Sequence, residues 1–103
     1  TMMCRIYSFA LALFLCAPLA FAQDQTAIDA GGTIYEMYCS GCHGPRLRNP
    51  GTSFDLRELT EGERTRFDAG VLYGKNMMPP WLGTVSDKDL DQLWAYIRAY
   101  AYE

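Results

Sequence analysis

The stretch Cys39-Ser40-Gly41-Cys42-His43 decides the fold of this chain. Two cysteines three positions apart can each add across one vinyl group of a haem, and a histidine directly after the second cysteine completes the attachment pattern of c-type haem. That histidine is held beneath the iron, where its imidazole can serve as an axial ligand. The stretch therefore predicts one covalently bound haem c, attached through Cys39 and Cys42 and ligated by His43.

Two other kinds of site also use a pair of cysteines at this spacing. A redox-active dithiol is expected in a βαβ context, and no strand pattern surrounds the motif. A structural zinc usually has four nitrogen or sulfur ligands. His43 is the only histidine, and Cys4 and Cys16 lie in a segment that we expect to be removed, so the zinc site cannot be completed.

Residues 1–22 have the features of a secretory signal peptide. Arg5 supplies a positive charge, Ile6 to Leu15 is almost entirely apolar, and Ala20-Phe21-Ala22 fits the small-x-small cleavage pattern. A single domain, residues 23–103, is therefore expected in the bacterial periplasm. A retained membrane anchor is the alternative, although the apolar run is at the short end for a span of about 20 residues.

The predicted mature chain is short and slightly acidic. A polypeptide of about 80 residues builds only a marginal core by itself, so we expect the haem to complete the core and the haem-free form to be largely unfolded. The net charge of −3 gives no basic patch for nucleic acid. The expected state is a monomer with no stable membrane insertion after cleavage of the leader.

Helical patterns cover most of this domain, and no segment alternates as a strand does. The first helix is expected from Ile28 to Cys39, with Asp29 as its N-cap. The glycine pair Gly31-Gly32 would weaken this helix, and it indicates the close approach of another backbone. A short helical turn is expected over Phe54 to Leu59.

Two further helices carry capping signals. Thr60 and Glu63 form a T-x-x-E capping box for a helix over Glu61 to Tyr73, and Gly74 lies at its C′ position. The last helix is expected from Ser86 to about Ala101, with Asp89 completing its cap. Between them, Lys75 to Val85 forms a loop that two consecutive prolines stiffen. The fold class is all-α.

The second axial ligand of the iron must come from the remaining soft side chains, since the chain has one histidine. Met37 lies two residues before Cys39, on the wrong side of the tether to cross the haem. Met77 and Met78 in the stiff loop remain, with an open or water-bound position as the alternative.

The chain resembles the class I c-type cytochromes over nearly all of residues 23–103. The motif lies near the mature N-terminus, and a Met-Pro step, Met78-Pro79, lies well downstream. Residues of both terminal helices match positions of that family: Gly31, Tyr35, Leu93, Tyr96 and Ile97. The resemblance implies the cytochrome c fold, three to four helices wrapped around one covalently bound haem, with His43 proximal and Met78, directly before proline, distal.

The resemblance also implies the surroundings of the haem. In that family the proximal imidazole donates to a proline carbonyl after the motif, for which Pro50 is our prediction and Pro45 the alternative. Trp81 is expected to pack on the haem. The candidates to face the haem propionates, which need donors when buried, are Arg46, Arg48, Tyr73 and Trp81.

The function that the resemblance implies is exported one-electron transfer, without catalysis, between a donor dehydrogenase and an acceptor oxidase or cytochrome. The stretch Phe54-Asp55-Leu56-Arg57 and the Met-Pro-Pro-Trp loop are similar to cytochromes that accept electrons from periplasmic quinoprotein alcohol dehydrogenases. The alternatives are a haem enzyme or gas sensor with an open sixth position, and a haem subunit of a larger redox complex.

Overall fold

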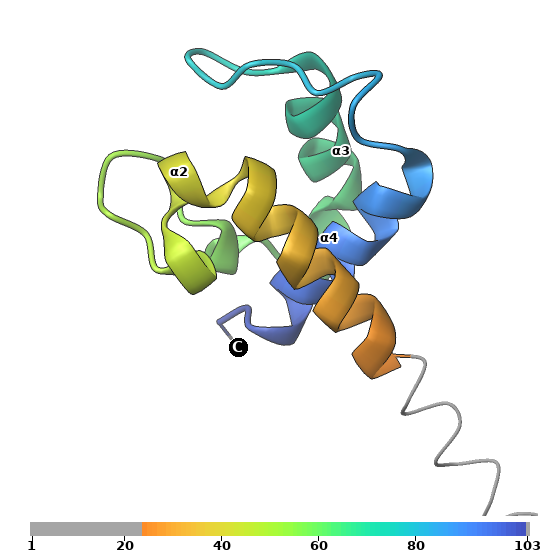
Figure 1. Cartoon of the computed structure of the whole chain (residues 1–103). Helices are drawn as coiled ribbons and strands as arrows, with labels where there is room; N and C mark the ends of the chain where they lie inside the picture. The colour runs from red at the N-terminus through yellow and green to blue at the C-terminus, as the bar shows by residue number, and fades with distance from the viewer. Residues whose placement is uncertain (1–23, 103) are drawn as a thin grey trace, which may run out of the picture.

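The computed structural model describes residues 24–102, and the predicted leader, residues 1–22, lies outside this range. The first helix covers residues 24–38. The elements that follow are α2 (Ser40–His43), the 3₁₀ turns η1 (Pro45–Leu47), η2 (Leu56–Glu58) and η3 (Glu61–Glu63), and the helices α3 (Arg64–Tyr73) and α4 (Asp87–Ala99) (Figure 1). The described residues contain no strand, only single bridge pairs in the loop between α3 and α4. The predicted all-α class is confirmed.

The first helix crosses α4 at close range, and Figure 1 shows it (orange) passing across α4 (blue). A Cβ atom on Gly31 would overlap the backbone carbonyl oxygen of Gln92 and would lie 2.9 Å from the Cβ of Tyr96. Only glycine leaves room for this approach. The prediction that the glycine pair marks a neighbouring backbone is therefore confirmed at Gly31.

The start of the first helix differs from the prediction. The chain is already helical at residue 24, four residues before Ile28, so the assignment of Asp29 as N-cap is wrong. Asp29 lies inside the helix, where its carboxylate accepts a hydrogen bond from Gln25 Nε2 (2.8 Å). A glutamine one turn earlier supports the helix across this position, which the capping rule alone does not consider.

The helix predicted over Glu61 to Tyr73 is present as η3 followed directly by α3. The backbone N–H of Thr60 donates to Glu63 Oε1 (2.9 Å), as the capping box requires, and the Thr60 hydroxyl donates to the same oxygen (3.0 Å). Gly74 ends α3 with a φ of 76°, and its N–H donates to the Gly70 carbonyl. The predicted caps at both ends are confirmed.

The last helix, α4, has the predicted Ser86 cap and ends earlier than expected. Ser86 Oγ accepts from the Asp89 N–H (3.1 Å), and the Asp89 carboxylate accepts from the Ser86 N–H (3.0 Å). The helix ends at Ala99 rather than Ala101, because the next N–H, that of Tyr100, donates to the Ile97 carbonyl in a tighter turn. The chain then turns back towards η2.

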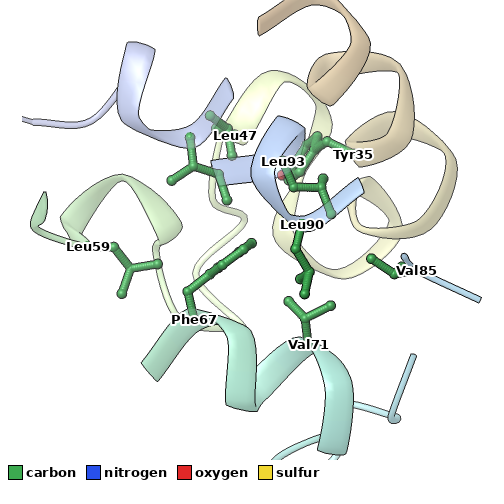
Figure 2. Close-up of a cluster of buried hydrophobic side chains, with 9 residues drawn as sticks. Tyr35, Leu47, Leu59, Phe67, Val71, Val85, Leu90 and Leu93 are labelled. Carbon is green, nitrogen blue, oxygen red and sulfur yellow. The ribbon is translucent and has the colours of Figure 1, made fainter. Parts of the chain in front are cut away.

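One cluster of apolar side chains forms the core of the described chain. Figure 2 shows side chains from all the longer helices and from the connecting turns pointing into it. The buried members are Tyr35, Leu47, Leu59, Phe67, Val71, Val85, Leu90, Leu93 and Ile97. The apolar face of α4 supplies Leu90, Leu93 and Ile97, in agreement with the helical periodicity of the sequence.

Among residues 24–102, none of the helices combines the length and the apolar character that crossing a membrane requires.

Candidate haem site

The C-x-x-C-H motif lies at a break between two helices. The first helix ends at residue 38, and α2 begins after Cys39, whose carbonyl accepts from the His43 N–H (3.0 Å). Cys39 is half-buried, Cys42 is exposed, and neither forms a disulfide. Tyr35, one turn before Cys39 and fully buried, donates its hydroxyl to the Gly44 carbonyl at 2.5 Å. The motif is therefore anchored to the core on both of its sides.

Burial also sets the protonation of groups around the motif. It raises the pKa of the Cys39 thiol to about 11, and the neighbouring Cys42 adds to this effect. Burial likewise raises the pKa of the Tyr35 hydroxyl above its ordinary value of 10.0, with a further contribution from Cys39. Both groups are therefore protonated at neutral pH, and the Tyr35 hydroxyl keeps the hydrogen that it donates to Gly44.

The His43 imidazole has a hydrogen-bond partner that orients it. Its Nδ1 atom lies 3.0 Å from the backbone carbonyl oxygen of Phe54. Because a carbonyl oxygen only accepts, Nδ1 carries the hydrogen and the lone pair of the neutral ring is on Nε2. The ring thus has the tautomer that a metal ligand bound through Nε2 needs.

The acceptor is not the predicted one. We expected the Pro50 carbonyl, with Pro45 as the alternative, and the structure gives the carbonyl of Phe54 instead. The reason lies in the turn that follows the motif. Arg46 and Leu47 both have positive φ, 54° and 62°, and the chain folds back so that a Cβ on Gly44 would lie 3.3 Å from Pro50 Cδ. Pro50 therefore lies beside the Gly44 backbone, and only four residues later does the chain reach the imidazole.

The two methionines of the loop differ sharply in exposure. The Met77 side chain is 98% exposed, whereas Met78 is partly buried and packs against the core cluster. Reciprocal hydrogen bonds close the turn that holds them, Lys75 N–H to the Met78 carbonyl (3.1 Å) and Met78 N–H to the Lys75 carbonyl (2.9 Å). This turn fixes the backbone of Met78 and directs the two side chains to different environments.

Trp81 connects the methionine loop to the segment before the motif. Its ring lies 5.1 Å from that of Tyr38, the residue preceding Cys39. The backbone N–H of Trp81 donates to the Val71 carbonyl (2.8 Å), and the backbone carbonyl of Trp81 accepts from the backbone N–H groups of Thr84 and Val85. The structure therefore brings the predicted residue Trp81 to the edge of the motif.

Apart from Trp81, the side chains predicted to bind the haem propionates make fewer contacts than the other residues of the site. Arg46, Arg48 and Tyr73 all have exposed side chains. Arg46 is held through its backbone, since its N–H donates to Glu36 Oε1 (2.9 Å). The described contacts fix neither arginine side chain on a particular partner.

The sequence does not predict the contacts of Phe54 and Ser53 with the motif. The Ser53 hydroxyl donates to the Cys42 carbonyl (2.6 Å), which ties the residue before Phe54 to the motif. No short pattern indicates these contacts, because they join residues 11 positions apart through backbone carbonyls that every residue carries.

The family model described as "Cytochrome C oxidase, cbb3-type, subunit III" matches residues 26–97, which include the whole motif and the Met78-Pro79 step. The chain belongs to this family of c-type cytochromes. It therefore carries covalently bound haem c, and its domain is of the kind that transfers electrons through haem. The resemblance seen in the sequence is confirmed.

Individual proteins similar to this chain include a cytochrome c6 and two quinohemoprotein alcohol dehydrogenases. Cytochrome c6 of Gracilaria tenuistipitata var. liui is 32% identical over 84 residues, which are 77% of this chain and 75% of that protein. Two quinohemoprotein alcohol dehydrogenases of Pseudomonas putida, ADH-IIG and ADH IIB, are 33% and 29% identical over 89 residues. The chain spans only 12% and 13% of the length of these dehydrogenases. No solved structure gives a significant match.

The residues present fit the cofactor. Thioether attachment needs two free cysteines, and the described chain has two, Cys39 and Cys42. An axial imidazole needs a free nitrogen lone pair and a second partner for its other nitrogen, and the contact of His43 with Phe54 meets both conditions. A soft thioether is available from Met78 at the surface of the core.

Proposed function

We propose that this cytochrome is an exported one-electron carrier whose haem is attached through Cys39 and Cys42 and ligated by His43 and Met78. The leader, residues 1–22, would direct it to the periplasm and be removed there, leaving a monomeric domain, residues 23–103. It would carry electrons from a donor dehydrogenase to a terminal acceptor and have no catalytic activity of its own. The contact between His43 Nδ1 and the Phe54 carbonyl is the observation that carries this proposal.

Each residue of the proposed site has a separate part. The carbonyl of Phe54 holds the imidazole of His43 in one tautomer and orientation, so that Nε2 is free for the metal. The closed turn from Lys75 to Met78 holds the second ligand in place. When bound, the haem iron supplies one-electron chemistry, and a thioether ligand raises its reduction potential.

Met78 is a better candidate than Met77 for the second ligand. A side chain that is 98% exposed makes few contacts that would direct it to a buried metal, whereas Met78 already packs against the core cluster. Trp81, whose ring is tilted by 45° against that of Tyr38, would pack on the haem next to the attachment site. Arg48 would donate to a haem propionate, because its exposed side chain is free to turn towards the haem.

The surface next to this site suits brief encounters with other redox proteins. Exposed apolar side chains occur on the methionine loop and on the helices before it, namely Met37, Tyr73, Met77 and Leu82. Pro79 and Pro80 are exposed in the same loop. Small, weakly charged interfaces of this kind are typical of transient electron-transfer complexes.

The donor that we propose is a quinoprotein alcohol dehydrogenase. Two quinohemoprotein alcohol dehydrogenases contain a segment similar to 84% of this chain, which supports the idea that such a cytochrome accepts electrons from an enzyme that oxidises alcohol. The similarity to cytochrome c6, of which the chain covers 75%, supports a free carrier over a subunit of a larger complex.

Binding of carbon monoxide to the reduced holoprotein tests the proposal. With both axial positions filled by protein ligands, carbon monoxide should bind slowly or not at all at neutral pH. Rapid and stoichiometric binding would instead indicate a haem enzyme or gas sensor with an open sixth position. The donor is tested separately, by following the reduction of the cytochrome by a purified quinoprotein alcohol dehydrogenase with and without alcohol. If the cytochrome is reduced no faster with alcohol than without it, this choice of donor is wrong.

A further inference from the structure

The C-terminal residues form a network with η2, the turn that follows Phe54. Arg57 Nε donates to the Tyr100 carbonyl (2.8 Å), and the Tyr102 N–H donates back to the Arg57 carbonyl (2.9 Å). The Arg57 guanidinium lies over the Tyr102 ring, 4.4 Å from its centroid. The Tyr102 hydroxyl donates to Asp55 Oδ2 (3.0 Å). Tyr100 and Tyr102 are thus fixed to a segment more than 40 residues earlier in the sequence.

This network ends at the residue next to Phe54. The second carboxylate oxygen of Asp55 accepts from the Arg57 N–H (3.0 Å), which sets the start of η2. On the other side of Phe54, the Ser53 hydroxyl donates to the Cys42 carbonyl (2.6 Å). The peptide whose carbonyl accepts from His43 is therefore held at both of its neighbours, by the motif on one side and by the C-terminal residues on the other.

The Phe54 side chain itself does not hold this peptide in place. It is 42% exposed, and its ring contacts the Arg66 guanidinium, 4.8 Å from the ring centroid. The position of its carbonyl therefore depends on the hydrogen bonds of the neighbouring residues rather than on burial of the ring.

We propose that Arg57 and Tyr102 are positioning residues for the proximal ligand: by fixing η2, they hold the Phe54 carbonyl against His43 Nδ1 and so adjust the reduction potential of the haem. This inference rests on the proposed role of His43 as axial ligand.

The sign of the effect follows from the chemistry of the imidazole. A short bond from Nδ1–H to a carbonyl makes the ring a stronger electron donor through Nε2, which favours the oxidised metal and lowers the potential. Loosening η2 weakens this bond. The imidazole then donates less, the reduced state gains stability, and the potential rises.

The matched pair of variants is Arg57→Gln and Arg98→Gln. Arg98 makes the same kind of link as Arg57 across a similar sequence distance, since its Nη1 donates to the carbonyl of Leu59 (2.6 Å), the residue that caps the end of η2 farther from Phe54. Among residues 24–102, this side-chain hydrogen bond of Arg98 does not reach Ser53 or Asp55, the neighbours of Phe54. Both variants lose one bond between the C-terminal region and the middle of the chain, so both are expected to lower the melting temperature. Only Arg57→Gln should affect the proximal hydrogen bond. Tyr102→Phe, which removes a single hydroxyl, should act in the same direction and more weakly.

The test measures two properties of the holoprotein, its midpoint potential and the solvent-exchange rate of the His43 ring N–H by NMR of the reduced form. We expect Arg57→Gln to raise the reduced-to-oxidised ratio at fixed solution potential about threefold, which is about 30 mV for a one-electron couple, and to speed ring N–H exchange about tenfold. Arg98→Gln should leave both properties as in the wild type.

Equal potentials and exchange rates in Arg57→Gln and the wild type would overturn the inference, as would equal shifts in Arg57→Gln and Arg98→Gln. Failure of the underlying ligand assignment is recognised separately. In that case the wild-type protein itself shows no slowly exchanging ring N–H and no spectrum of an imidazole-ligated haem.

Discussion

Gly31 lies directly against the backbone carbonyl of Gln92, at the point where the first helix crosses α4. No side chain separates the two helices there. A Cβ on Gly31 would also lie 2.9 Å from the Cβ of Tyr96, so a larger residue cannot fit by a simple change of rotamer. The close crossing of the first helix and α4 therefore depends on the absence of a side chain at Gly31.

Replacement of this glycine should destabilise the protein. Gly31→Ala forces the two helices apart or bends one of them, and overpacking of this kind costs about 1–3 kcal/mol. Thermal unfolding of the holoprotein, followed by circular dichroism, should show a lower melting temperature. The control is Gly62→Ala, since a Cβ on the exposed Gly62 meets no atom within 4 Å. If Gly31→Ala unfolds at the same temperature as Gly62→Ala, the close crossing is not present in solution.

The two adjacent methionines should differ in their spectroscopic effect. Met78→Ala is expected to abolish the charge-transfer band between methionine sulfur and ferric iron, because it removes the partly buried thioether that we propose as ligand. Met77→Ala, which alters a side chain that is 98% exposed, should leave the band unchanged. The reverse pattern would assign the ligand to Met77, and loss of the band in neither variant would exclude both.

The capping residue Glu63 should make a pH-dependent contribution to stability. The hydrogen bond from the Thr60 backbone, followed by that from Arg66, lowers the pKa of the Glu63 carboxyl from its ordinary value of 4.5 to about 2. Because the folded pKa is the lower one, the stabilisation is fully present above pH 4.5 and is lost as the pH falls towards 2.

Glu63→Gln should therefore unfold at a lower temperature than the wild type at pH 7, and the difference should shrink as the pH falls from 4.5 towards 2. The matched control is Glu61→Gln, which removes an exposed carboxylate from the same turn without disturbing the capping box. A difference between Glu63→Gln and wild type that stays constant over this pH range would show that the carboxylate is not held by Thr60 in its ionised form.

Removal of the haem should have a larger effect than any single substitution. The nine buried side chains found within residues 24–102 form a small core, and a domain of about 80 residues gains only marginal stability from such a core. We therefore expect the haem-free protein, or a variant with Cys39→Ser and Cys42→Ser made without haem, to be largely unfolded by circular dichroism. A cooperative thermal transition in this protein, close to that of the holoprotein, would show that the polypeptide folds without its cofactor.

The sequence predicted best those features that local chemistry determines. The sequence predicts the caps at Thr60, Gly74 and Ser86, because each depends on residues within four positions of the helix end. The same holds for the apolar face of α4, which follows from helical periodicity. The glycine at position 31 was correctly associated with a nearby backbone, since few other reasons place glycine inside a helix.

The features that the sequence did not predict depend on the path of the chain. The acceptor for His43 lies at Phe54 rather than Pro50 because Arg46 and Leu47 adopt positive φ, a conformation that neither residue type favours. Likewise, the link between Arg57 and Tyr102 joins distant segments through one half-buried side chain, one exposed side chain and backbone groups. No spacing rule describes such contacts, because they exist only once the tertiary fold has brought the segments together.

Attachment of the haem through Cys39 and Cys42 is tested most directly by acid–acetone extraction of the purified protein. The protein should be made together with functional haem-ligation machinery and examined by visible spectroscopy and mass spectrometry. We expect the haem to stay with the polypeptide after extraction and the mass to exceed that of the apoprotein by one haem. The double variant Cys39→Ser with Cys42→Ser should abolish both results. A colourless wild-type protein with the mass of the bare polypeptide would contradict this attachment.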